Sequence, residues 1–136
     1  METAPVLDSD VLIDHLRDSG PGRELVDELG VTTGFRITAV TAFELAGGRE
    51  YAHDPGPVDV LLGAPCLPLT RAAAVHAGAL LRALRAAGAG IDVRDAMQAA
   101  ICLHARARLV TRNSRHFERV PGLDVIEPGS WPAPAG

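Results

Sequence analysis

The sequence has no lysine and few aromatic residues. All 13 basic residues are arginine, and Phe, Trp and Tyr together make up 4% of the 136 residues. Its apolar runs are far shorter than the ~20 residues that a membrane-spanning helix needs. The N-terminal residues show neither the basic start nor the long apolar stretch of a signal peptide. We therefore expect a cytoplasmic protein without a membrane partner, in which any site that requires a lysine amine is excluded.

Cysteine is also scarce. The two cysteines, Cys66 and Cys102, lie in apolar surroundings and lack the spacing of metal ligands, so we interpret both as buried free thiols. The five histidines are scattered along the chain without a paired-ligand spacing.

Composition and charge indicate an ordinary globular domain with an uneven charge distribution. Hydrophobic residues make up 47% of the chain and charged residues 22%, with a net charge of −4, which suits one domain of this length. Residues 1–68 carry 12 acidic residues and 4 arginines, whereas residues 69–136 carry 5 acidic residues and 9 arginines. The mildly acidic total is therefore an average of two unlike halves.

Short apolar or β-branched segments alternate with segments of helical periodicity. Strands are predicted at 6–7, 36–40, 66–69, 109–111 and 123–126, and helices at 11–16, 23–29, 41–46, 58–62, 71–87 and 92–105. Pro68 places the third strand at an edge of the sheet. The alternation predicts an α/β domain over residues 1–127, a parallel sheet with helices on both faces. Residues 128–136, rich in Pro and Gly, form a predicted C-terminal tail in which Trp131 is either docked or exposed.

Three acidic residues fall where predicted strands meet predicted helices. Asp8 ends the first strand, Glu44 lies in the first turn of the helix after the second strand, and Asp95 lies in the first turn of the helix before the fourth strand. Ligands of open α/β sheets bind beyond the carboxyl ends of the strands. Clustered carboxylates repel one another unless a cation lies among them. A hard divalent ion, Mg²⁺ or Mn²⁺, suits such an all-oxygen set.

Each of these acids also has a purely structural interpretation. Glu44 fits a capping box with Thr41, and Asp95 fits one with an N-cap at Asp92. Asp8 could simply close the turn after the strand, with Ser9 as the N-cap of the first helix. The spacing alone leaves both interpretations open.

Four segments of the chain, taken in order, resemble the successive motifs of PIN-domain proteins, above all the VapC-type toxins of bacterial and archaeal toxin–antitoxin pairs. They are 6–13 (VLDSDVLI), 37–45 (ITAVTAFEL), 95–101 (DAMQAAI) and 109–117 (LVTRNSRHF). The resemblance extends over about residues 6–127. It implies a sheet with strand order 3-2-1-4-5 and a ribonuclease that uses Mg²⁺ or Mn²⁺.

In that family the acids of the first three motifs hold the metal, which implies this role for Asp8, Glu44 and Asp95. Asn113 follows the Thr-Arg pair at the family's fourth catalytic position, and His116 stands where an acid is often found. The resemblance further implies a cognate antitoxin as partner, an RNA substrate that is cut at phosphodiester bonds by metal-activated water, and a homodimer.

An RNA substrate requires positive charge around the acidic site. Arg112 and Arg115 flank Asn113 and are the best candidates for contact with phosphate. Phe43 and Phe117 are expected in the core, so aromatic platforms for bases are scarce. Recognition is then expected to rest on RNA shape and backbone.

Two alternatives belong to other functional classes. Asp8 and Asp10 after an apolar strand resemble the nucleophile and acid–base pair of a haloacid-dehalogenase-like phosphatase, and a receiver domain would also place acids at strand ends. Both families ordinarily use a lysine near the phosphate, which this chain lacks. A non-catalytic PIN-like binding module would keep the fold and show no metal-dependent turnover.

Overall fold

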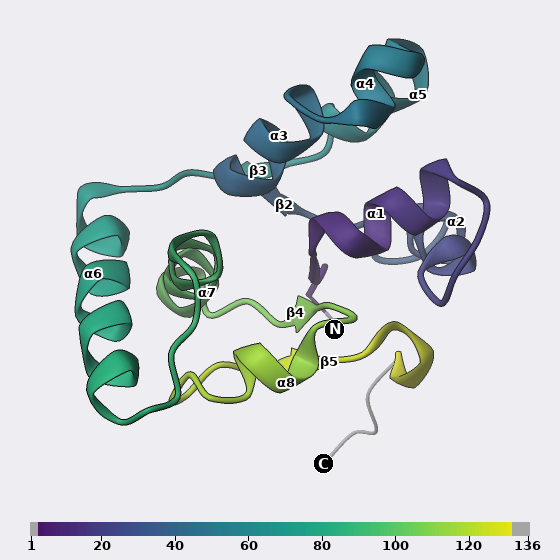
Figure 1. Ribbon diagram of the computed structural model, residues 1–136. Coiled ribbons are helices and arrows are strands. Elements are labelled where there is room, and N and C mark those ends of the chain that lie inside the picture. The colour runs from purple at the N-terminus through teal and green to yellow at the C-terminus, as the bar shows by residue number, and fades with distance from the viewer. Residues whose placement is uncertain (1–2, 132–136) are drawn as a thin grey trace.

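A parallel sheet runs through the protein in the computed structural model, which describes residues 3–131 (Figure 1). Strands β1, β4 and β5 pair side by side, as do β2 and β3, and every pairing is parallel. Backbone hydrogen bonds from Leu7 to Arg36 (3.0 Å) and from Arg36 to Pro5 (2.8 Å) join the two groups. The order is therefore 3-2-1-4-5, as predicted. The strands are β1 (Val6–Leu7), β2 (Ile37–Thr38), β3 (Cys66–Leu67), β4 (Leu109–Val110) and β5 (Val125–Ile126).

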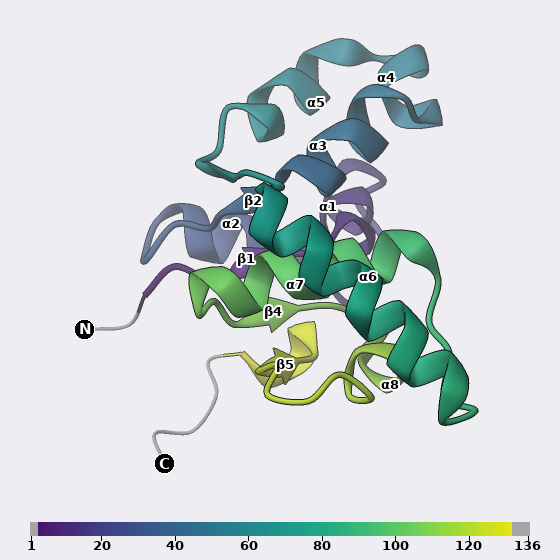
Figure 2. The ribbon, with the colours of Figure 1, turned by 90° about the vertical axis from the view of Figure 1, so that its left-hand side faces the viewer.

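Helices cover both faces of this sheet. Successive strand residues point to opposite faces, so Val6 and Leu109 belong to one buried cluster, and Leu7 and Val110 belong to the other. The first cluster is covered by α6 (Arg71–Ala86) and α7 (Val93–Ala105), and the second by α1 (Ser9–Leu16) and α2 (Arg23–Gly30) (Figures 1 and 2). The predicted fold class is confirmed. Among residues 3–131, no helix has both the length and the apolar character needed to cross a membrane.

Three helices between β2 and β3 form a layer at one end of the molecule, at the top of Figure 1. They are α3 (Ala39–Ala46), α4 (Arg49–His53) and α5 (Pro55–Leu62), and α5 adds Val58 and Leu61 to the second cluster. The sequence did not predict α4. Its five residues bury no side chain, so it has no apolar periodicity by which it could be found.

The C-terminal region adds two short turns of helix, α8 (Ser114–Phe117) and the 3₁₀ helix η1 (Pro128–Ser130). Trp131 packs against the second cluster, and the Arg108 guanidinium lies 5.7 Å from the centre of its ring. Trp131 is therefore docked. Residues 132–136 of the predicted tail lie outside the described residues, and a boundary at residue 127 stays a prediction.

Three local expectations were wrong. The second strand ends at Thr38 rather than at residue 40, because the Thr38 side chain accepts a hydrogen bond from the Thr41 amide and starts α3 there. Phe43 is 79% exposed rather than in the core, because α3 buries the face that carries Val40 and Leu45. Cys66 is a free thiol but an exposed one, on the edge strand β3. Phe117 and Cys102 are buried as expected.

Candidate active site

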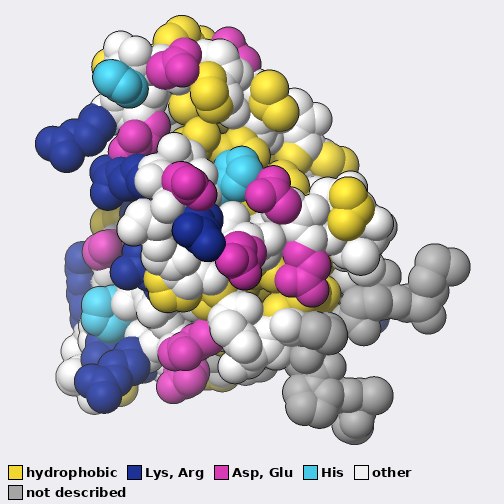
Figure 3. Space-filling view, turned by 90° about the vertical axis from the view of Figure 1, so that its right-hand side faces the viewer, with side chains coloured by type: hydrophobic (Ala, Val, Ile, Leu, Met, Phe, Trp, Pro, Cys, Tyr) yellow, Lys and Arg dark blue, Asp and Glu magenta, His cyan; other side chains and the backbone are white. Residues whose placement is uncertain are grey.

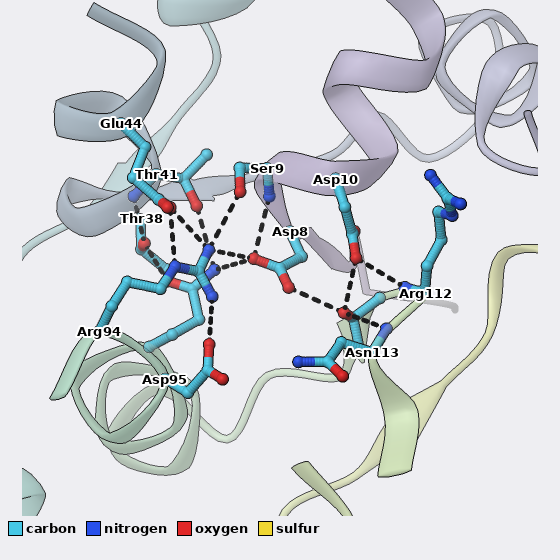
Figure 4. A network of polar contacts seen from close by, with 12 residues as sticks. Asp8, Ser9, Asp10, Thr38, Thr41, Glu44, Arg94, Asp95, Arg112 and Asn113 are labelled. Atoms are coloured by element: carbon cyan, nitrogen blue, oxygen red, sulfur yellow. Dashed lines mark hydrogen bonds and ion pairs between the residues drawn. The ribbon is translucent and has the colours of Figure 1, made fainter. Parts of the chain in front are cut away.

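Asp8 lies directly after β1 and starts α1. Its Oδ1 accepts a hydrogen bond from the Ser9 amide (2.9 Å), so Asp8 rather than Ser9 is the N-cap. Its Oδ2 accepts from the Thr111 hydroxyl (2.8 Å), which comes from the end of β4. The side chain is almost completely buried. These bonds fix the carboxylate at the carboxyl edge of the two central strands (Figure 4).

Glu44 reaches the same place from α3. Because this helix starts at Ala39, Glu44 stands in its second turn and not, as predicted, in its first. The Thr41–Glu44 capping box was also wrong, since Thr38 caps the helix. The Glu44 carboxylate is therefore free of a capping role and contacts Arg94. Its side chain keeps 31% exposure, so this acid forms the open side of the cluster.

Asp95 lies in the first turn of α7. The Asp92 side chain accepts a hydrogen bond from the Asp95 amide (2.7 Å), which confirms the predicted N-cap. The Asp95 carboxylate itself is buried and faces the other two acids (Figure 4). Burial raises the pKa of Asp95 above its ordinary value, although the neighbouring Arg94 opposes that rise.

One guanidinium links the three acids, which no sequence pattern predicted. Arg94 donates from Nη2 to Asp8 Oδ1, from Nε to Glu44 Oε1 (2.8 Å) and from Nη1 to Asp95 Oδ1 (2.8 Å). Nη2 also donates to the Ser9 hydroxyl (3.2 Å). Burial alone would lower the pKa of Arg94, but the three carboxylates raise it above its ordinary value, so the group stays charged. Acids from three separate segments thus converge on one positive charge.

This convergence bears on whether the site fits a divalent metal. No ready-made group of three His, Cys, Asp or Glu ligands occurs among residues 3–131, and the bonds of Arg94 to all three acids give the reason. The donor atoms are carboxylate oxygens gathered around one cation, which is the ligand chemistry of Mg²⁺ and Mn²⁺. With the guanidinium displaced, Asp8, Glu44 and Asp95 are the residues that would hold such an ion.

Asp10 lies beside this cluster on α1. Its Oδ2 accepts hydrogen bonds from the Arg112 amide (3.1 Å) and the Thr111 hydroxyl (3.3 Å). Its Oδ1 is buried and has no hydrogen-bond partner among residues 3–131. Burial and the charge of Asp8 raise the pKa of Asp10 to about 6. An unpartnered buried carboxylate oxygen is a further available acceptor next to Asp8.

Gln98 supports the cluster from α7 and was missed by the sequence analysis. Its Nε2 donates to Asp8 Oδ1 (3.2 Å) and to the Thr41 hydroxyl (3.0 Å), and its Oε1 accepts from the Thr38 hydroxyl. The side chain is fully buried. One signal was available: Gln98 interrupts the apolar face of its helix, and a buried amide requires partners.

The residues after β4 occupy the opposite side of the cluster. The Asn113 amide donates to the Thr111 hydroxyl (3.0 Å), while its side chain contacts His116 (2.9 Å). Of the described hydrogen bonds of Asn113, none reaches the three acids. Arg112 donates to the buried Asp14 (2.8 Å) and keeps 47% of its side chain exposed. Arg115 is exposed on α8. The structure thus places Asn113 and Arg112 beside the cluster without joining them to the three acids (Figure 4).

Positive charge is visible on the same side of the molecule. In Figure 3, arginine side chains lie along the left-hand margin, which is the side toward which the strands end, while acidic side chains lie across the middle of the face. Basic side chains therefore gather on the side of the molecule toward which the strands end.

The PIN domain profile matches residues 6–123. The chain belongs to the PIN-domain family. It is 34% identical over 122 residues to Ribonuclease VapC19 of Mycobacterium tuberculosis, covering 87% of this chain and 95% of that protein.

Solved structures agree with the PIN fold. A DNA-bound VapBC complex from Salmonella typhimurium contains a chain with a TM-score of 0.75 and 21% identity, covering 93% of this chain and 99% of that one. A toxin–antitoxin complex from Klebsiella pneumoniae gives a TM-score of 0.73 and 21% identity, covering 92% and 98%. At these identities the likeness concerns the fold alone.

Proposed function

We propose that this PIN-domain protein is a Mg²⁺- or Mn²⁺-dependent endoribonuclease and the toxin of a toxin–antitoxin pair. The observation that carries the proposal is the convergence of Asp8, Glu44 and Asp95 on one cation at the carboxyl edge of the sheet. Three carboxylates that lie close together repel one another and raise the free energy of the folded state unless a positive charge lies among them. The relative named Ribonuclease VapC19 supports a ribonuclease.

Each residue of the site has its own proposed role in phosphodiester hydrolysis. Asp8 and Asp95 are proposed as direct metal ligands, and Glu44 as a third ligand or as the base that orients the attacking water. A bound divalent ion supplies activated water and neutralises phosphoryl charge. Asn113 is proposed as the fourth catalytic position. Arg112 and Arg115, both exposed in the segment that follows β4, are proposed to bind the RNA phosphates.

Several partners follow from the same proposal. The neighbouring structures are toxin–antitoxin complexes, which supports a cognate antitoxin protein as the partner of this chain. A homodimer and a cytoplasmic location complete the proposal. Co-purification with the product of the adjacent gene, and growth arrest on expression without that product, would support the toxin role. Unrestrained growth without it would contradict the role.

The alternatives gain no support from the site. A phosphatase that uses Asp8 and Asp10 would need the second acid free to exchange a proton with substrate. Instead, one Asp10 oxygen is bonded to Thr111 and Arg112, and the other is buried. A non-catalytic module stays the relevant alternative, because it differs from the proposal only in lacking metal-dependent turnover.

The test is cleavage of structured RNAs with Mg²⁺ or Mn²⁺, with EDTA, and with metal restored after EDTA. We expect cleavage only with free metal, and a loss of about 100-fold or more in Asp8→Asn and Asp95→Asn proteins, because each loses a charged ligand. Asp27→Asn is the matched control, since Asp27 is 81% exposed on α2. Equal cleavage by all four proteins would refute the site, and no cleavage by any of them would favour the binding module.

A further inference from the structure

Arg94 is placed unusually for a residue in the first turn of a helix. Its neighbours Asp92 and Val93 are exposed, yet the Arg94 side chain turns inward and keeps only 23% exposure. All three of its nitrogens donate to carboxylates, each from a different element of the chain. Such a planar fork spreads its donors over three nitrogens and so spans several carboxylates, whereas an ammonium group presents its donors from a single nitrogen.

The oxygens that Arg94 occupies are the ones that a metal would need. It holds Asp8 Oδ1, Glu44 Oε1 and Asp95 Oδ1, while Asp8 Oδ2 is already bonded to Thr111. The acids therefore have few free oxygens that still face a common point. A guanidinium and a divalent cation among the same oxygens would also repel each other. Simultaneous occupancy is disfavoured for both geometric and electrostatic reasons.

We propose that Arg94 is an internal competitor of the divalent metal. In the metal-free protein its guanidinium offsets part of the charge of the three carboxylates and holds them in place, and it must leave them before the ion can bind. Arg94 thereby sets the metal affinity of the site. This inference rests on the proposed metal site and adds to it a residue that no acid motif identifies.

Removal of the competitor is expected to tighten metal binding. If Arg94 occupies the cluster in 90–99% of the metal-free molecules, the apparent affinity is reduced about 10- to 100-fold. We expect Arg94→Ala to bind Mn²⁺ about 10-fold more tightly or better, measured by calorimetry and by the loss of the free-Mn²⁺ electron paramagnetic resonance signal. Arg94→Lys should lie between the two, because its ammonium keeps the positive charge but presents all its donors from one nitrogen, without the planar fork that spans the three acids. Arg17→Ala is the matched control: Arg17 pairs with Glu50 (2.7 Å) near the other end of α1, and its removal should leave the affinity unchanged.

A second measurement tests occupancy directly. The space left in the Arg94→Ala protein should accept free guanidinium at millimolar, non-denaturing concentration. We expect added guanidinium to raise the melting temperature of metal-free Arg94→Ala protein and to weaken its Mn²⁺ binding, with neither effect in the Arg17→Ala protein. Without guanidinium or metal, the Arg94→Ala protein should melt below wild type and regain stability with Mn²⁺.

Each result has a defined meaning. Unchanged or weaker Mn²⁺ binding in the Arg94→Ala protein would overturn the inference, while RNA cleavage that still depends on Asp8 and Asp95 would leave the proposed function standing. Absence of Mn²⁺ binding in wild type and Arg94→Ala alike would refute both. If Arg94→Ala protein folds only when Mn²⁺ is present, the inference is supported. If it folds in neither condition, the Mn²⁺ affinity of the Arg94→Lys protein is compared with that of wild type instead, and unchanged or weaker binding would overturn the inference.

Discussion

Replacement of Gln98 by leucine tests whether the acidic cluster is held in place by a buried polar network. Gln98 is fully buried, and its amide joins Asp8, Thr38 and Thr41 from three elements. Leucine has a similar volume, so the substitution removes hydrogen bonds without opening a large cavity. The change in stability therefore measures the network rather than the packing.

The magnitude follows from the bonds that are lost. Two bonds join neutral groups and contribute about 1 kcal/mol each, and the bond to the Asp8 carboxylate contributes about 1.5–3 kcal/mol. We expect the free energy of unfolding to fall by about 3.5–5 kcal/mol, which corresponds to a decrease of roughly 15 °C in melting temperature for a domain of this size. With a urea slope of about 2 kcal/mol/M, the midpoint should fall by about 1.8–2.5 M.

A double-mutant cycle separates the network from a general loss of stability. Thr38→Val together with Gln98→Leu removes both partners of one buried bond, so the pair should cost clearly less than the sum of the two single changes. Met97→Leu, at a half-buried neighbouring position of α7, is the packing control and should stay within about 0.5 kcal/mol of wild type. A Gln98→Leu protein as stable as the control, or strict additivity in the cycle, would refute the network.

Two further predictions concern the turn after α1 and the cysteines. Gly20 has φ +100° and a Cβ there would lie 2.6 Å from the Asp14 carboxylate, whereas Gly34 has φ +75° and open space. Gly20→Ala should therefore lower the free energy of unfolding by about 2–4 kcal/mol and Gly34→Ala by about 1 kcal/mol; equal urea midpoints would contradict the steric argument. In Ellman assays one thiol, Cys66, should react in the native protein and two after unfolding, because burial raises the pKa of Cys102 to about 12; equal native rates would contradict this assignment.

The fold could be predicted because most strands and helices have a local sequence pattern and because the motifs follow one another in the order that the resemblance implies. Apolar pairs such as those in β1 and β4 are bounded by acids or polar residues that start helices, and the motif order supplied the arrangement of strands. Helix starts were predicted to within a few residues. The differences at Ser9 and Thr41 arose because capping depends on which of several nearby polar side chains reaches the helix amides, and sequence does not decide between them.

The site could be predicted only in part, for a related reason. Asp8 and Asp95 stand at strand or helix ends, where topology alone brings residues together. Arg94 is one of nine arginines in residues 69–136, and its inward rotamer depends on Asp8 after β1 and on Glu44 of α3. Periodicity assigns Gln98 to a buried face but cannot name its partners. Local sequence patterns do not predict which side chains pair when they lie far apart in the sequence.

The acidic cluster can belong to a stable protein before any metal binds. Buried carboxylates without a counter-ion destabilise a fold, since each must lose hydration without compensation. Hydrogen bonds from Arg94 and Gln98 compensate for the lost hydration of Asp8, and a hydrogen bond from Arg94 does the same for Asp95. Folding of the cluster therefore does not require a metal ion. Arg94 and Gln98 offset part of the charge of these acids in the folded protein, and in the proposed nuclease the affinity for the ion becomes a property that one arginine can adjust.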